Sequence, residues 1–481
     1  MVERARWIIA WSVLLAFAAA SRASAQTEAD ARPSLQNESF DIDLVIGPVL
    51  GSGRIIGLAG AYTALGDGVE GAARNPTGYA GRTLYDLDWF EWDITVDLMP
   101  RAIRNSDFDG NGESGFSYAD FVFITLGGSL RFGGFGLGLV ADFQSYDLGD
   151  EADLTLQQTH FGVAYGFWEG QLTIGAGART ASLAITAEGS GEPLVEMFGA
   201  GPELGATLGL EGQPFRVGLA LRTHVESEAV DVPVAAGFEL PDHVRLPWEL
   251  QVGLAWQLGP RPLNRRFVNP NEERAALWRQ ARQDRARRIA LQLEHEQLDQ
   301  RLRWAQGTLP PDRAHLQNDR PRDRDFWREE EARNANLEPE IEVELATRLA
   351  EREREVRGFS RRYLLISTEL FLIGPIDDGV GLESFLQQRR QTSGEYVSFG
   401  VRAGVEGEPI AGYVKMRAGT YLEPSRFAGV GYRVHGTLGT EIRLFSWDLF
   451  GLLDEFTFRA GATADVAERY LNVGFGFGFW H

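Results

Sequence analysis

The chain has 481 residues, contains no cysteine and carries a formal net charge of −21. Without cysteine it can form neither a disulfide scaffold, nor a thiolate metal site, nor a thiol nucleophile. The acidic excess argues against a nucleic-acid-binding protein, because neutralising phosphates requires a basic face. The length fits two or three ordinary domains or one large β-barrel.

Residues 1–25 have the features of a secretory signal peptide. Two arginines precede an apolar stretch from Trp7 to Ala20, and small residues at 23–25 suit a cleavage site. No later segment holds about 18 uninterrupted apolar residues, so membrane-spanning helices are not expected. The sequence therefore predicts an exported chain that begins at Gln26 after cleavage.

Residues 26–83, called the hatch below, differ in amino-acid composition from the rest of the chain. Small residues dominate this segment, as in GSGRIIGLAGAYTALGDGVEGAARNPTGYAG at 51–81. Such a stretch is too poor in large apolar side chains to build a core of its own. It can pack as a compact plug against a wall lined by glycine.

From residue 84 onward the dominant period is two. Phe90, Trp92 and Ile94, for example, alternate with Glu91 and Asp93, which gives a strand with one apolar and one acidic face. The pattern predicts eight strands within 84–258 and six within 361–481. The fourteen expected strands lie near 84–98, 119–131, 135–147, 155–167, 170–186, 201–211, 214–225, 247–258, 361–373, 395–406, 409–422, 431–445, 454–465 and 469–480.

A soluble β-sandwich also alternates, but three features favour a membrane barrel. The strands run ten or more residues, which suits a tilted membrane strand better than a soluble one of about 5–6 residues. Aromatic residues cluster at strand ends, and tight turns at 131–135, 167–171, 211–215 and 406–410 alternate with longer links. We therefore expect an all-β fold, a fourteen-stranded antiparallel transmembrane β-barrel with an N-terminal plug.

The final strand, YLNVGFGFGFW at 470–480, places large apolar residues on one face and mainly glycine on the other. In a membrane barrel the phenylalanine face meets lipid, while glycine leaves room inside the lumen. The last strand must also pair with the first to remove both sheet edges.

Between strands eight and nine, residues 259–360 change to a helical period. One helix should begin after Asn269, with Pro270 at its first position, and end by Gly307; a second should run from about Pro339 to Arg357. If both termini are periplasmic, links after even-numbered strands are periplasmic too, so this antiparallel helical hairpin is placed in the periplasm. It is either a solvated spacer or an arm, at 260–360, that binds a periplasmic protein.

Charged residues recur at positions expected to face the lumen. A network of ion pairs that holds the plug to the wall is one interpretation, and a polar permeation path is the other. The candidate lumen-facing residues are Arg179, Arg216, Arg222, Arg402, Lys415, Arg417, Arg443, Glu249 and Glu441.

The stretch NSDFDGNGE at 105–113 contains Asp107, Asp109 and Asn111 in the spacing of a calcium loop. The twelfth position is Tyr118 instead of glutamate, so a solvated turn is the alternative. No other cofactor is predicted. The histidines show no metal-ligand spacing and no catalytic constellation emerges, so we do not expect an enzyme.

The hatch motif followed by fourteen strands resembles the FadL-like outer-membrane transporters of hydrophobic compounds and the related PorV-like proteins. Thr77 stands where the family has alanine, and Gly66-Asp67-Gly68 replaces Ala-Asp-Asp. The matching positions, which the resemblance assigns to hatch and gating, are Arg54, Gly57, Gly60, Asp67, Asn75 and Pro76.

The resemblance implies an outer-membrane protein of a Gram-negative bacterium, surrounded by lipid, that passively takes up a hydrophobic small molecule past the hatch. The PorV-like alternative is a scaffold or secretion component that binds periplasmic partners through the helical insertion. A general polar porin is disfavoured, because a plug would block it.

Overall fold

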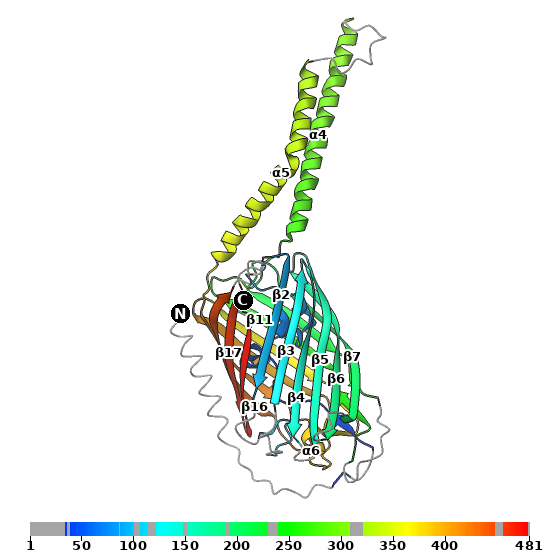
Figure 1. The fold of residues 1–481 in the computed structure, drawn as a ribbon, viewed down its shortest axis with the longest axis vertical. Helices are drawn as coiled ribbons and strands as arrows, with labels where there is room; N and C mark the ends of the chain where they lie inside the picture. Colours follow the sequence, from blue (N-terminus) through cyan, green and yellow to red (C-terminus); the bar gives the residue numbers. More distant parts are fainter. Residues whose placement is uncertain are drawn as a thin grey trace. The chain divides into compact units, whose positions relative to one another are not determined.

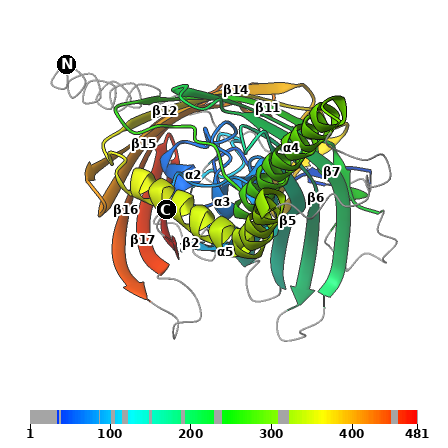
Figure 2. The same ribbon diagram turned by 90° about the horizontal axis from the view of Figure 1, so that it is seen from above.

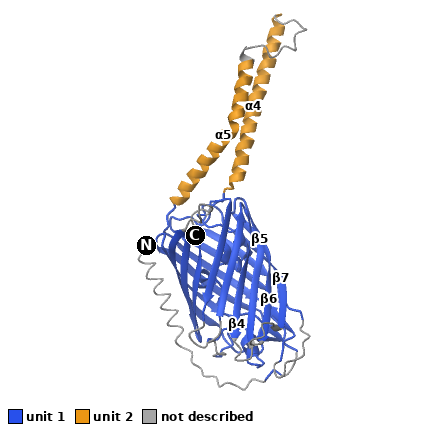
Figure 3. Cartoon of the chain, in the orientation of Figure 1, with its two compact units in different colours: residues 1–267, 359–481 blue, residues 268–358 orange. Residues whose placement is uncertain are grey.

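The computed structural model describes residues 34–35, 39–85, 87–100, 106–113, 122–147, 152–187, 193–228, 239–307, 321–447 and 456–479. The predicted signal peptide and the start at Gln26 lie outside these residues. The chain divides into two compact units, residues 1–267 with 359–481 and residues 268–358 (Figure 3).

The first unit is built on a closed barrel of fourteen strands, which confirms the predicted fold class (Figure 1). Each strand pairs antiparallel with its neighbours, and β18 returns to β2 through four residue pairs, Phe475–Leu98 to Gly478–Thr95. In order around the barrel the strands are β2 (Phe90–Met99), β3 (Val122–Phe132), β4 (Phe135–Asp147), β5 (Ala152–Phe167), β6 (Leu172–Ala187), β7 (Pro193–Leu208), β8 (Phe215–Arg222), β11 (Glu249–Leu258), β12 (Leu364–Ile373), β14 (Ser398–Ile410), β15 (Val414–Glu423), β16 (Arg433–Trp447), β17 (Phe456–Ala467) and β18 (Tyr470–Phe479).

The barrel is apolar on its outside and polar on its inside. In β8, Phe215, Val217, Leu219 and Leu221 are all 39–45% exposed, while Arg222 on the opposite face is buried. The same alternation runs through β2, β11 and β18. A closed sheet with this outer face has no unpaired edge strand and suits a hydrocarbon environment.

The two ends of the barrel differ in their connections. Tight turns join β3 to β4, β5 to β6 and β14 to β15 at one end, here called the turn end, and most long links lie at the other, the outer end. Two expectations about the turns were wrong: the position of one turn, and the placing of tight turns at one end of the barrel only. The turn expected at 406–410 lies between Ile410 and Val414, after a register shift in β14, and a two-residue turn joins β17 to β18 at the outer end.

The described part of the hatch lies inside the barrel (Figure 2) and runs from β1 (Asp41–Asp43), at the outer links, to Gly81, which accepts from Arg131 near the turn end. Its first strand, β1, pairs in parallel with β10 (His243–Leu246) and β13 (Gly379–Gly381) of the outer links, and β10 also pairs with β9 (Val225–Glu226). The helices α2 (Gly53–Gly57), α3 (Gly68–Ala72) and the 3₁₀ helix η1 (Pro76–Tyr79) follow inside the barrel. The first described residues therefore lie at the outer end, because β1 is held by outer links. The periplasmic placement of both termini concerns residues outside those described and stays a prediction.

Wall glycines provide the space that the hatch occupies. A Cβ atom on Gly218 of β8 would lie 2.1 Å from the backbone oxygen of Thr63, and one on Gly205 of β7 would lie 2.0 Å from Oδ1 of Asn75. The glycines of β18 serve another purpose, because a Cβ on Gly476 would meet the side chain of Asp97 at 2.1 Å. The final strand thus makes room for a neighbouring wall side chain, and strands elsewhere make room for the hatch.

The second unit is an antiparallel pair of helices, α4 (Pro270–Ala305) and α5 (Pro321–Arg357). Asn269 caps α4 through its side chain, as the sequence indicates. The expected start of the second helix near Pro339 was wrong, since α5 begins at Pro321 and contains Pro339 internally. A proline inside a helix costs about 3 kcal/mol, which the helix-favouring residues on both sides offset here.

Among the described residues of this hairpin, Leu277 packs with Ile341 and Leu345 in a small buried apolar core. Farther along, Arg288 pairs with Glu330, at 2.5 Å between Nε and Oε1. Among the described helices none is long and apolar enough to cross a membrane.

Replacing Gly218 with alanine tests whether the wall is shaped for the hatch. We expect Gly218→Ala to lower the free energy of unfolding by about 1–3 kcal/mol, because the new methyl group overlaps hatch backbone. Gly128→Ala in β3 is the matched control, since a Cβ there would meet nothing within 4 Å. Thermal unfolding in detergent micelles measures both variants, and equal shifts would show that the hatch is not seated on this wall.

Candidate functional site

A ring of buried ion pairs joins the hatch to four adjacent strands. Arg54 of α2 contacts Glu406 at 3.0 Å, and Glu70 of α3 contacts Arg459 at 3.0 Å. On the wall, Arg417 bridges Glu406 and Glu441 at 2.7 Å each, and Glu441 also lies 3.4 Å from Arg459. Arg54 and Glu70 lie 3.8 Å apart, which closes the ring. In strand order its wall members are Glu406, Arg417, Glu441 and Arg459, with Lys415 3.6 Å from Glu441.

A second group of charges fills the lumen on the side of β7, β8 and β11. Arg222 contacts Glu203 and Glu249, each at 3.3 Å, and Arg179 donates to Glu249 at 2.5 Å. Arg222 also donates to the backbone oxygens of Ala73 and Arg74 in the hatch. His160 adds a contact of 3.0 Å to Glu203. Wall charges on this side therefore hold hatch backbone directly.

Two further arginines were expected to face the lumen on other strands. Arg402 donates to Glu369 at 2.6 Å, and Glu369 accepts from the backbone N–H groups of Tyr62 and Thr63 in the hatch. Arg443 is half-buried and donates to the hydroxyls of Ser446 and Thr457.

The predicted hatch residues each meet the wall or shape the hatch itself. Asp67 accepts from Arg216 at 2.6 Å. Asn75 is fully buried, donates to the backbone oxygen of Thr63 at 2.8 Å and accepts from the N–H of Thr77. Pro76 follows as the first residue of η1.

Gly57 and Gly60 of the hatch motif are glycines under two different constraints, a close backbone approach and a positive φ angle. A Cβ on Gly57 would lie 3.2 Å from the Cα of Gly439, so hatch and wall backbones are in close approach there. Gly60 has a φ of +77°, a conformation that favours glycine.

Several partners were missed by the sequence analysis. Glu406 lies on the polar face of its predicted strand, so alternation could have found it. Glu369 lies in a strand that reads as apolar on both faces for part of its length, which hides its register. Glu70 belongs to the hatch, where no period of two exists.

The lumen holds a cavity of about 140 Å³ in its outer half. Its lining mixes apolar and charged side chains: the hatch contributes Leu44, Ile46, Leu50, Ile55 and Arg74, and the wall contributes further apolar and charged residues. A smaller cavity of about 70 Å³ lies at the turn end, against the hatch residues Leu65 and Ala80. The hatch therefore lines both spaces.

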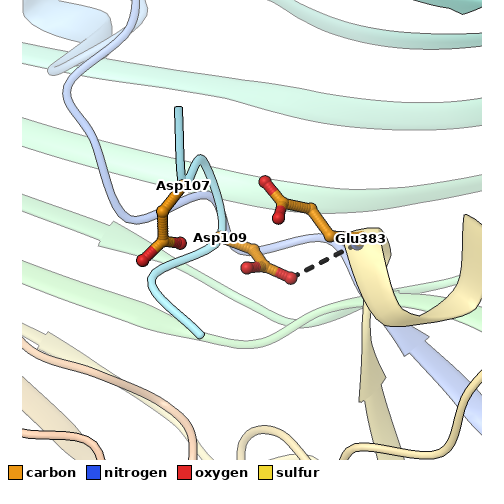
Figure 4. Close-up of side chains that lie close together, drawn as sticks. All are labelled: Asp107, Asp109 and Glu383. Carbon is orange, nitrogen blue, oxygen red and sulfur yellow. Dashed lines mark hydrogen bonds between the residues drawn. The ribbon is translucent and has the colours of Figure 1, made fainter. Parts of the chain in front are cut away.

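The predicted calcium loop lies at the outer end, where Glu383 joins it (Figure 4). Carboxylate oxygens of Asp107, Asp109 and Glu383 all lie within 4.8 Å of one another. Glu383 is in α6 (Leu382–Leu386), and the sequence offers no local signal for a partner so far along the chain. Asn111 uses its side-chain oxygen to accept from the N–H of Glu113. Positions 105, 118 and 120 of the loop lie outside the described residues.

These three carboxyls are buried, and burial raises their pKa values. For Asp109 and Glu383 the pKa lies well above the ordinary carboxyl range, and the neighbouring acids raise it further. Arg433, 3.3 Å from Asp107, opposes the rise at Asp107. Because the folded-state pKa values are raised, these groups lower stability as pH rises above about 4, and bound protons or a bound cation would relieve this.

No protein-family model and no curated protein matches the chain. Among solved structures, it is similar to a FadL homologue from Pseudomonas aeruginosa, with 10% identity, 90% of this chain and 98% of that chain covered, and a TM-score of 0.43. The P. putida toluene transporter TodX gives 10% identity, 90% and 98% coverage, and a TM-score of 0.44.

The monoaromatic hydrocarbon channel CymD gives 11% identity, 92% and 97% coverage, and a TM-score of 0.43. These neighbours agree with the FadL-like resemblance of the sequence, while the PorV-like relationship stays a prediction. Because the TM-scores lie below 0.5, the fold of this chain rests on its own strand pairing.

Calcium is expected to stabilise the protein if the outer loop binds it. At pH 8 the unfolding temperature should be higher in millimolar calcium than in chelator, with about 2.7 kcal/mol of stabilisation at a hundredfold excess over Kd. Asp109→Asn should raise the unfolding temperature in chelator, because one of three repelling carboxylates is gone, and should abolish the calcium effect.

Asp378→Asn is the control for this test, since Asp378 is an exposed acid of the outer link that also carries Glu383. This variant should keep the full response to calcium. An unfolding temperature of the unaltered protein that does not change with calcium would contradict the predicted site.

Proposed function

We propose that the chain is an outer-membrane channel for passive uptake of small hydrophobic molecules past the hatch. The apolar outer face of the closed barrel supports residence in a membrane, and the predicted signal peptide supports export. The polar, filled lumen argues against an open porin, because the hatch is tied to the wall on several sides.

The outer cavity carries this proposal. Its lining includes Leu44, Ile46 and Leu50 of the hatch, which offer apolar contacts to a ligand inside it. A dry protein cavity of about 150 Å³ holds benzene, and drug-sized ligands need about 300–1,000 Å³. A cavity of about 140 Å³ therefore suits a molecule with one ring and is too small for a long acyl chain.

Filling this cavity tests the route. Leu50 lines the cavity and is only partly buried, so Leu50→Trp should occupy the space without disturbing the barrel. We expect this variant, expressed in a Gram-negative host, to reduce uptake of radiolabelled toluene several-fold relative to the unaltered chain.

The matched control places the same substitution on the lipid face. Leu254 of β11 is 43% exposed on the outside of the barrel, so Leu254→Trp should leave uptake unchanged. If both variants take up toluene at the unaltered rate, the cavity is not part of the path. If the unaltered chain gives no uptake above the host background, the transport function itself is wrong.

Partner binding through the helical hairpin is the second candidate function. Beyond the core around Leu277, α4 exposes apolar side chains that no described residue covers, with Leu298 at 50%, Leu302 at 60% and Trp304 at 74% exposure. A solvated spacer has no need of such residues. This observation supports an arm that contacts another protein.

Deleting the hairpin separates the two functions. The deletion should span 268–358 and be closed by a Gly/Ser linker, because Asn264 and Phe267 contact barrel and hatch residues and must remain. If the hairpin only binds partners, toluene uptake should stay at the full rate while co-purification of periplasmic proteins is lost. A Trp304→Ser variant of the full chain should weaken the same co-purification, and unchanged recovery from both variants would contradict the arm.

A further inference from the structure

The outer cavity has a mixed lining of apolar and charged side chains, and four of the charged ones are arginines. Arg74, Arg179, Arg222 and Arg402 all line it. A cavity for purely apolar molecules would not need these groups, since burying a charge is costly unless it is paired. The state of each guanidinium therefore decides what the cavity can bind.

Two of these arginines are fully occupied. Arg179 contacts Glu249 and donates to two backbone oxygens, and Arg222 contacts Glu203 and Glu249 besides hatch backbone. Their donors hold the wall and the hatch together. They have little capacity left for a ligand.

The other two arginines have donors to spare. Arg74 donates to the backbone oxygen of Leu50 at 2.9 Å and takes part in no ion pair within the described part of the chain. Arg402 pairs with Glu369 through Nη1, but its Nε atom is buried and has no hydrogen-bond partner among the described residues. Arg74 therefore leaves N–H groups unused at the cavity, whereas the Nε atom of Arg402 is enclosed against Gly60 of the hatch.

Carboxylates at or beside the cavity pair with three of its four arginines, Arg179, Arg222 and Arg402. Glu249 is held by Arg179 and Arg222, and Glu70 by Arg459. Asp142 is the remaining carboxyl of the lining, and it accepts from the hydroxyl of Thr125 at 2.7 Å. A carboxyl can lose its charge by binding a proton, whereas a guanidinium stays charged at any physiological pH. The charge that needs a partner is therefore that of Arg74.

We propose that the outer cavity binds a small amphipathic carboxylate, such as an aromatic acid, with its carboxylate at Arg74. The apolar body lies against Leu44, Ile46 and Ile55 of the hatch. Guanidinium groups bind carboxylates through paired, charge-assisted hydrogen bonds, which gives this end its selectivity. The inference refines the proposed function by naming its substrate class, and it rests on that function only for the direction of entry.

Calorimetric titration of the purified full-length protein in detergent tests the inference with three probes of one size. Benzoate carries the carboxylate, benzamide is neutral, and benzylamine is cationic. We expect benzoate to bind roughly 10- to 100-fold more tightly than benzamide, as charge-assisted hydrogen bonds imply, and benzylamine not to bind. Equal affinities for benzoate and benzamide, or tighter binding of benzylamine through Asp142, would overturn the proposal.

Variants assign the effect to Arg74. Arg74→Gln should weaken the affinity for benzoate by about tenfold or more without changing the affinity for benzamide. Arg74→Lys should recover part of the lost affinity for benzoate. Arg443→Gln is the matched control, because Arg443 lies on β16 and is not part of the cavity lining. If Arg74→Gln does not fold, the probe comparison on the unaltered protein still decides. An unchanged affinity for benzoate in folded Arg74→Gln would contradict the site.

These experiments distinguish a failure of the carboxylate site from a failure of the proposed channel function. Selective benzoate binding without toluene or benzoate uptake by cells would leave the site in place and remove the channel function. Uptake of toluene that benzoate does not inhibit, together with no difference between benzoate and benzamide in calorimetry, would keep the channel and remove the carboxylate site.

Discussion

The ring of ion pairs between hatch and wall is the interaction on which the rest of the lumen depends. It runs from Arg54 through Glu406, Arg417, Glu441 and Arg459 to Glu70, and so fixes two helices of the hatch against four strands. Removing one partner from such a buried pair costs about 3–5 kcal/mol, because the other charge is left without compensation. The hatch is therefore held by a few strong contacts that must break together.

This constraint bears on how a ligand passes. Expelling the whole hatch would break the ring, the Arg216–Asp67 pair and the hydrogen bonds of Arg222 to hatch backbone. Residues 44–52, in contrast, line the outer cavity and meet the wall through few polar contacts, such as the N–H of Val49 with Tyr421. Under the proposed function, a small ligand would pass by local rearrangement of this segment while α2 and α3 stay in place. A one-ring ligand suits that route better than a long chain.

Alternation with a period of two was enough to predict the barrel and its strand number, because one face of each strand meets lipid and the other does not. Alternation did not predict the position of a turn next to a register shift, and the helical pattern did not predict the start of α5. The turn after β14 moved by several residues because β14 contains a register shift, and the hairpin helix runs through Pro339 because its flanks favour helix.

Features that depend on distant pairs could not be read from the sequence. Glu383 joins Asp107 and Asp109 from a link hundreds of residues away, and β1 is held at the outer end by β10 and β13. Gly476 of β18 is another example, because the side chain of Asp97 on the neighbouring strand occupies the space that a larger residue would need. In each case the missing information was which strand lies beside which.

The sequence left two interpretations of the lumen charges open, an ionic network and a polar path, and the pairing pattern separates them by position. Most of the charged groups form pairs that join strand to strand or strand to hatch, which is what a structural network requires. If that were their only purpose, the charges at the cavity would be paired as well. Arg74 and Asp142 are not in ion pairs with described residues, and both line the cavity together with apolar side chains. The same residue types thus hold the hatch in most of the lumen and leave a charged surface for a ligand where space remains.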